Sequence, residues 1–153
     1  MDSRIDDHFR QHRAEHLADL EAFVRIPSVS ADPERRTDVR RTADWLAAKL
    51  GEAGIQNARL AETAGNPVVT GEWLAAPGKP TILIYGHYDV QPADPLESWE
   101  SPPFEPTHRD GRIYARGISD DKGPLWQAVK AVEAILTLDA KLPVNLKFCF
   151  EGE

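Results

Sequence analysis

The feature that most constrains the fold is a continuous apolar run over residues 81–85, followed at once by Gly86, His87, Tyr88 and Asp89. Such a run is typical of a strand covered on both faces, as parallel strands are in α/β proteins. In open α/β sheets, ligands bind outside the carboxyl ends of the strands. The run therefore predicts a buried strand that carries reactive side chains at its functional end.

The rest of the chain predicts helices in alternation with strands. Apolar residues recur at helical spacing in three segments, residues 4–24, 38–52 and 123–138. Strand patterns occupy residues 68–74, 81–85, 112–114 and 144–150. Thr37 is expected to cap the second helix, and the proline-rich residues 91–106 are expected to form a long loop. The alternation predicts an α/β domain with a mostly parallel central sheet.

Length and charge exclude several classes of function. A chain of 153 residues is typical of one domain, and its net charge of −7 disfavours nucleic acid and anionic membranes as partners. The apolar runs are far shorter than the ~20 residues of a membrane helix, and the charged start does not resemble a signal peptide. The single cysteine, Cys149, excludes an internal disulfide and indicates a reducing, cytoplasmic location.

His87 and Asp89 are the first candidate site residues. If the backbone stays extended after the strand, residues two apart point the same way. Asp89 could then hold one ring nitrogen of His87 and leave the other nitrogen free for a metal ion, as in carboxylate–histidine–metal arrangements. The alternative is a surface histidine beside a turn-forming aspartate, which an isolated motif of this length favours.

Two further acidic segments lie at the ends of predicted elements. Asp120 and Asp121 precede the helix at 123–138, where a carboxylate could bridge two metal ions. The alternative is a helix start, at which acidic residues cap free amides, and Lys122 could instead neutralise the pair. Glu151 and Glu153 follow the last strand as possible ligands, a general base or a solvated turn.

Other reactive residues are expected to be structural. His8, His12 and His16 recur every four residues without an H-E-x-x-H pattern, so we expect a solvated helix face. Cys149 alternates with apolar residues and is expected to be buried. The tryptophans are expected to pack in the core, with Trp99 near the site. Nucleotide-binding and serine-hydrolase motifs are absent from the sequence.

Taken together and in this order, the segments resemble a known family. The matching stretches are Phe23–Ser30, Tyr85–Pro92, Trp99 with Pro102–Phe104, Asp110–Gly117, Asp120–Pro124 and Phe150–Glu153. The chain is similar to the N-terminal part of dinuclear zinc metallopeptidases of the aminoacylase/carboxypeptidase/carnosinase type, and most similar to their dipeptidase branch. The resemblance implies a three-layer zinc-peptidase-like α/β domain, of which residues 1–153 would be an incomplete, N-terminal portion.

The resemblance also implies roles for single residues. His87 would bind one metal ion, Asp89 would orient His87, and Asp120 would bridge two divalent ions, most simply Zn²⁺, with Mn²⁺ or Co²⁺ as alternatives. A cis peptide is expected between Asp120 and Asp121. The family's general base would lie one position beyond Glu153, and its lid domain, through which members form homodimers, is not among these residues.

The implied reaction is hydrolysis of the amide bond of a dipeptide or an N-acyl amino acid, in which two metal ions activate water and a carboxylate takes its proton. We expect the 153 residues alone to be nearly inactive. One alternative is a short non-catalytic protein that uses the fold as a binding or interaction module. Another is a protein that binds a single metal ion through His87, Asp120 and either Glu151 or Glu153.

Overall fold

The computed structural model of the chain describes residues 3–153. Its α-helices are α1 (Ser3–Gln11), α2 (Arg13–Arg25), α3 (Arg36–Glu52) and α4 (Lys122–Asp139), and two short 3₁₀ helices are η1 (Pro33–Arg35) and η2 (Leu96–Ser98). The strands are β1 (Gln56–Ala61), β2 (Val68–Trp73), β3 (Thr81–His87), β4 (Thr107–Arg109), β5 (Arg112–Tyr114) and β6 (Asn145–Glu151).

The main sheet has the strand order β1-β2-β6-β3, and β4 pairs with β5 in a separate ribbon. The predicted α/β class is confirmed, but the sheet is mixed instead of mostly parallel. Only β3 and β6 run parallel, whereas β1 with β2 and β2 with β6 are antiparallel. The connection at residues 62–67 is too short for a parallel crossover, so β1 and β2 form a hairpin.

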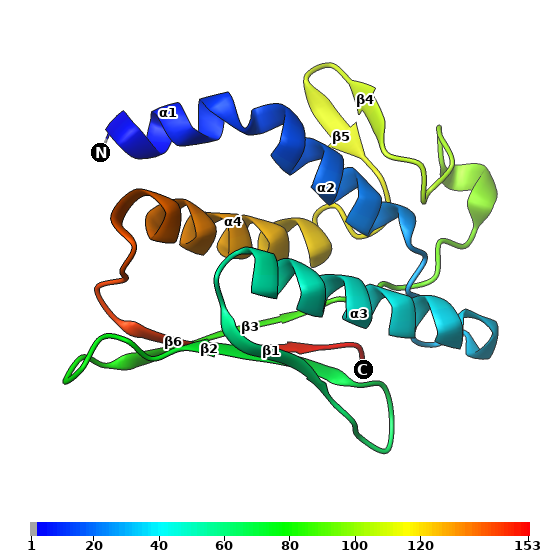
Figure 1. Cartoon of the computed structure of the whole chain (residues 1–153). Helices are drawn as coiled ribbons and strands as arrows, with labels where there is room; N and C mark the ends of the chain where they lie inside the picture. The colour runs from blue at the N-terminus through cyan, green and yellow to red at the C-terminus, as the bar shows by residue number, and fades with distance from the viewer. Residues whose placement is uncertain (1–2) are drawn as a thin grey trace.

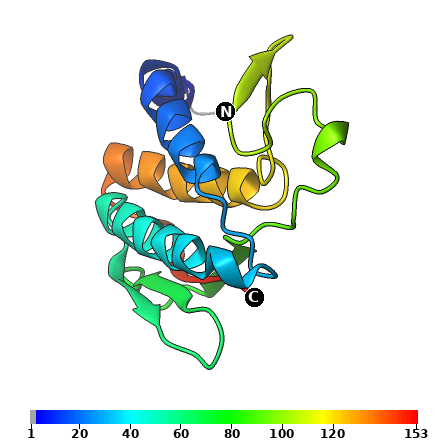
Figure 2. The ribbon, with the colours of Figure 1, turned by 90° about the vertical axis from the view of Figure 1, so that its right-hand side faces the viewer.

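All the helices lie on one side of the main sheet (Figure 1). The α3 helix packs on β1 and β2, α4 packs on β3, and α1 with α2 cover the outer side of α4, as the rotated view in Figure 2 also shows. The core between these layers contains Phe23, Leu46, Trp126, Val129 and Phe150, none more than 3% exposed. No helix within residues 3–153 is both long and apolar enough to cross a membrane.

The other face of the sheet is open within the described residues, and this corrects the prediction that residues 81–85 are buried on both faces. The strand itself is present as β3, but Leu83 is 61% and Tyr85 62% exposed. The difference arises because β3 is an edge strand of the described sheet and no helix in residues 3–153 covers its second face. The open face also leaves Cys149, on the central strand β6, only partly buried.

Local predictions failed where the sequence pattern was weak. The helix expected over residues 4–24 divides at His12 into α1 and α2, and α3 begins before Thr37, at Arg36. The strands β1 and β4 were not predicted because their residues are mostly polar or partly exposed. His8 does not lie on a solvated face: it is 8% exposed because α1 packs on α4.

Candidate metal centre

The titratable side chains predicted for the site meet at the carboxyl ends of β3 and β6. A cavity of about 250 Å³ there is lined by four carboxylates and two basic side chains, which are Asp89, Asp120, Glu151, Glu153, His87 and Arg116. The cavity is therefore strongly acidic in composition. An excess of carboxylates in a concave site attracts cations.

His87, the last residue of β3, lies between two carboxylates. Its Nδ1 atom is 3.1 Å from Asp89 Oδ1, and its Nε2 atom is 3.0 Å from Asp120 Oδ1. Asp89 is 2% exposed, whereas the Asp120 side chain is 80% exposed. The contact expected between Asp89 and one ring nitrogen of His87 is present, and the other nitrogen faces the open cavity.

The segment before α4 brings Asp120 to the site. The peptide between Asp120 and Asp121 is cis, as the family resemblance implied. Asp121 Oδ2 accepts a hydrogen bond of 3.2 Å from the backbone N–H of His87. Asp121 occupies the N-cap position of α4, but its side chain makes no capping hydrogen bond. The carboxylate of Asp121 therefore ties the segment to β3 instead of capping the helix.

Lys122 does not neutralise the neighbouring aspartates. Its side chain is fully buried, and Nζ donates to the carbonyl oxygens of Phe23 at 3.0 Å and Ile26 at 2.7 Å. It forms no salt bridge within residues 3–153, and burial lowers the pKa of its ammonium group to about 7. Lys122 instead fastens the start of α4 to the end of α2.

The electrostatics around His87 favour a positive charge at the ring. Partial burial lowers the pKa of His87, but the hydrogen bonds and charges of Asp120 and Asp89 outweigh burial, so the net pKa lies above its ordinary value. The negative charges of Asp89 and Asp120 that favour a proton on the His87 ring would also favour a metal cation bound there in place of the proton.

Sequence reasoning missed two side chains in this cavity. Tyr85 donates a hydrogen bond to Glu151, which raises the pKa of the Tyr85 phenol, and Glu151 pairs with His87 in the β3–β6 register. Arg116 donates to the carbonyl of Pro92 at 3.0 Å and lies 5.2 Å from the centre of the Trp99 ring. Tyr85 could have been found from its i, i+2 relation to His87, whereas no local signal pointed to Arg116.

The donor atoms of His87 and Asp120 fit a divalent metal ion. Imidazole nitrogen and carboxylate oxygen suit Zn²⁺, Mn²⁺ and Co²⁺. With Zn–N and Zn–O distances near 2.1 Å, two ligands of one ion lie ~3–3.5 Å apart, close to the 3.0 Å between Nε2 and Oδ1. Within residues 3–153, no group of three or more His, Cys, Asp or Glu side chains could hold a metal ion. His87 and Asp120 therefore form a pair of candidate ligands.

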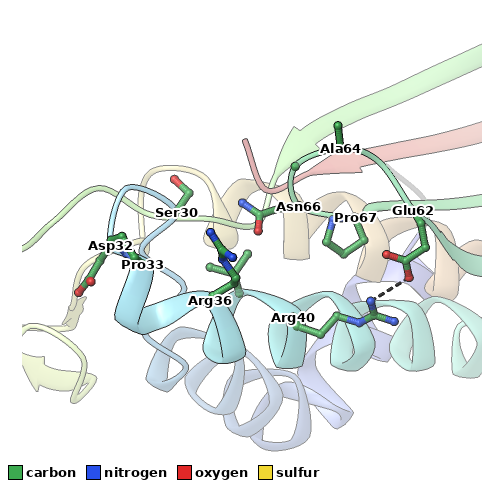
Figure 3. A pocket seen from close by; sticks show the side chains of 11 residues that line it. Ser30, Asp32, Pro33, Arg36, Arg40, Glu62, Ala64, Asn66 and Pro67 are labelled. Carbon is green, nitrogen blue, oxygen red and sulfur yellow. Dashed lines mark ion pairs between the residues drawn. The ribbon is translucent and has the colours of Figure 1, made fainter.

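A second cavity, of about 390 Å³, lies between the start of α3 and the loop at residues 62–67 (Figure 3). Arg40 and Glu62 form an ion pair of 2.8 Å on its wall, and Ser30 lies at its edge. Its lining residues include no histidine or cysteine, so its chemistry is less suited to a transition metal. The cavity at His87 is therefore the better candidate for a metal centre.

Comparison with known proteins explains this arrangement. Residues 83–153 match the peptidase family M20/M25/M40. The Cys-Gly metallodipeptidase dug1 of Schizosaccharomyces pombe is 40% identical over 148 residues, which cover 90% of this chain and 31% of that protein. Residues 83–153 thus carry part of an M20/M25/M40 peptidase domain, and the likeness to dug1 extends over most of the chain.

Solved structures of M20 dipeptidases share the fold of this chain. The dipeptidase Dug1p of Saccharomyces cerevisiae superposes with a TM-score of 0.88 at 29% identity, over 98% of this chain and 34% of that one. Human carnosine dipeptidase 1 superposes with a TM-score of 0.87 at 33% identity, over the same shares of 98% and 34%. The chain thus spans about a third of the length of these M20 proteins.

Proposed function

We propose that this chain is the N-terminal portion of the catalytic domain of a metal-dependent hydrolase, and that His87 and Asp120 hold a divalent metal ion in it. The whole protein would hydrolyse the peptide bond of dipeptides or the amide bond of N-acyl amino acids. The observation that carries the proposal is the position of the His87 ring, 3.1 Å from buried Asp89 and 3.0 Å from exposed Asp120.

The proposed roles follow from the burial of each group. Asp89 is buried and lies 3.1 Å from Nδ1 of His87, so it would accept an Nδ1–H and leave the lone pair of Nε2 for the metal. The Asp120 side chain is 80% exposed, so it would be accessible to a second ion as well. When bound, divalent ions at such a site activate water and polarise the scissile carbonyl. Asp121 keeps the Asp120 segment against β3 through the backbone N–H of His87.

The substrate class rests on the relatives. Proteins similar to this chain include a Cys-Gly metallodipeptidase and carnosine dipeptidase 1, so we infer small peptides as substrates. We infer Zn²⁺ as the ion, with Mn²⁺ and Co²⁺ as alternatives that suit the same donors. A reducing, cytoplasmic location is inferred from the single cysteine, and the whole protein is inferred to form homodimers.

Residues 1–153 by themselves are proposed to bind metal but to hydrolyse no dipeptide. A catalytic zinc site normally has three protein ligands, whereas His87 and Asp120 supply two. Glu151 offers a specific second candidate function, in which the chain holds a single ion. Glu151 pairs with His87 in the β3–β6 register and accepts a hydrogen bond from Tyr85. Within residues 3–153 it forms no three-ligand group with His87 and Asp120, so this alternative requires the Glu151 side chain to move toward the ion.

Calorimetric titration of the 153-residue chain with Zn²⁺ tests the assignment. We expect binding that His87→Ala abolishes and Asp120→Ala weakens at least tenfold. His108→Ala is a matched control, because its Nε2 lies 2.8 Å from Glu21 in an exposed histidine–carboxylate pair elsewhere. Unchanged affinity in His87→Ala would refute the site.

An activity assay tests the remaining part of the proposal. Cys-Gly and β-Ala-His are added to the Zn²⁺-loaded chain, and release of free amino acids is followed. We expect no turnover above that of Zn²⁺ alone. Hydrolysis at an ordinary enzymatic rate of ~1–10³ s⁻¹ would show that a general base is present among residues 1–153. A binding loss in Glu151→Gln as large as that in His87→Ala would favour the single-ion alternative.

A further inference from the structure

A short segment between α2 and η1 lies directly beneath the candidate metal centre. This segment, residues 26–30, is called the strap below. Ser28 Oγ donates to the carbonyl oxygen of Tyr88 at 2.7 Å, and the N–H of Val90 donates to the carbonyl of Ser28 at 2.9 Å. Val29 and Val90 form an isolated parallel bridge. The strap thus runs alongside the segment that follows His87.

The last residue of the strap contacts the carboxylate that orients His87. Ser30 Oγ donates to Asp89 Oδ2 at 2.6 Å, while Asp89 Oδ1 lies 3.1 Å from His87 Nδ1. Each carboxylate oxygen of Asp89 therefore has its own partner, and the main-chain oxygen of Asp89 also lies 3.2 Å from His87 Nδ1. A distance of 2.6 Å is typical of a strong, charge-assisted hydrogen bond from a hydroxyl to a carboxylate. Asp89 itself is 2% exposed, so its carboxylate is shielded from solvent.

The first residue of the strap is fastened to the segment that carries Asp120. The carbonyl of Ile26 accepts a hydrogen bond of 2.7 Å from Lys122 Nζ, and Lys122 follows Asp120 by two residues. Lys122 is fully buried, so this bond is shielded from solvent. The strap consequently contacts both segments that supply the candidate ligands, through Lys122 at one end and through Asp89 at the other.

We propose that Ser30 is a positioning residue of the metal centre, which holds the Asp89 carboxylate so that His87 keeps its proton on Nδ1 and presents Nε2 to the metal. The part that concerns metal affinity rests on the proposed function, whereas the part that concerns the His87 tautomer does not. Without the hydroxyl, Asp89 Oδ2 would be a buried charged oxygen with no partner, which is costly. The carboxylate would then rotate or shift toward another donor and hold Nδ1 less firmly.

Nitrogen NMR of the His87 ring in the metal-free chain gives a direct readout. At a pH where the ring is neutral, we expect the Nδ1–H tautomer in the wild type. In Ser30→Ala we expect a shift toward the Nε2–H tautomer, because Nε2 can donate to Asp120 Oδ1 at 3.0 Å. Zn²⁺ affinity should fall ~3–10-fold, less than the ~10–100-fold typical when the orienting residue itself is lost.

Two further variants separate positioning from packing. Ser30→Thr keeps the hydroxyl, and its extra methyl group has room because Ser30 borders the second cavity (Figure 3). We expect this variant to keep the wild-type tautomer and affinity. Ser28→Ala removes another buried hydroxyl from the same strap, whose acceptor is a backbone carbonyl. It should lower the melting temperature as Ser30→Ala does, yet leave the tautomer unchanged and the Zn²⁺ affinity within twofold.

The outcomes distinguish this proposal from the proposed function. A wild-type tautomer in Ser30→Ala, or an equal shift in Ser28→Ala, overturns the positioning role. If Ser30→Ala shifts the tautomer but the wild-type chain binds no Zn²⁺, the orientation of His87 by Ser30 is upheld and the metal site fails. If Zn²⁺ binds through His87 and Ser30→Ala changes neither readout, the metal site is upheld and the role of Ser30 fails.

Discussion

Replacing Gly123 with alanine should damage both the fold and the metal centre. Gly123 is buried in the first turn of α4, where alanine would ordinarily stabilise a helix by ~1 kcal/mol. Here an added Cβ would lie 2.0 Å from the carbonyl oxygen of Ile118. That atom belongs to the backbone and cannot swing aside as the end of a side chain can.

The magnitude follows from the overlap. Ordinary contact begins at 3.4 Å and the added Cβ would lie at 2.0 Å, so α4 and the loop at residues 117–120 must separate by roughly 1.4 Å. Overpacking of this kind costs ~1–3 kcal/mol and occasionally more, and the backbone partner places Gly123→Ala at about 3 kcal/mol. For a chain of this size that corresponds to a melting temperature lower by ~6–12 °C. The loop carries Asp120, and a displacement of ~1 Å at a site can cost ~10²-fold in function.

Thermal unfolding followed by circular dichroism, together with Zn²⁺ titration, measures both effects. Gly51→Ala is the matched control, because Gly51 lies in α3 and a Cβ there would meet nothing within 4 Å. We expect Gly51→Ala to be equally or more stable than the wild type, with unchanged Zn²⁺ affinity. A Gly123→Ala chain that melts at or above the wild-type temperature would refute the close approach of α4 to Ile118.

Three other perturbations have expected outcomes. Asp89→Asn should leave the far-UV circular dichroism spectrum unchanged but lower Zn²⁺ affinity ~10–100-fold; wild-type affinity would show that Asp89 does not orient the histidine. Lys122→Met removes the donor to two backbone carbonyls at the end of α2, so urea titration should show a loss of ~1–3 kcal/mol; an unchanged midpoint would contradict this. Partial burial and the charge of Lys130 lower the pKa of His16 below its value in the unfolded chain. Because the unfolded chain then binds a proton at His16 more readily, the free energy of unfolding should fall as the pH drops below ~6.5. NMR titration should find the His16 pKa higher in Lys130→Gln, and no change would exclude Lys130 as a cause.

The fold was predictable where one physical pattern dominates a segment. The apolar stripe of α4 and the alternation in β6 each reflect one buried face, so residues 123–138 and 144–150 were placed within two residues of the observed elements. The apolar run in β3 identified a strand but not its burial. An apolar run such as this one is compatible with one covered face or with two, so the sequence pattern could not predict that Leu83 and Tyr85 are exposed.

The site was predictable only in its local part. His87 and Asp89 are two residues apart, and their contact follows from the extended backbone. Ser30 lies 59 positions from Asp89, in a segment whose residues show no metal-ligand spacing, so its hydrogen bond could not be inferred from the sequence pattern. The acidic neighbours of Lys122 allow the alternative that it neutralises them, but the packing of α4 on α2 directs its side chain inward.

The position of β6 in the sheet has a consequence for how the chain folds. This central strand pairs with β2 on one side and β3 on the other, yet it follows both in the sequence, with β4, β5 and α4 between β3 and β6. Closing that long segment costs about 0.6 kcal/mol more for each doubling of loop length, and such non-local pairing slows folding. We therefore expect the local β1–β2 hairpin to form early and β6 to dock late. Glu151 would come beside His87 only in that last step, so the sheet and the acidic lining of the cavity would be completed together.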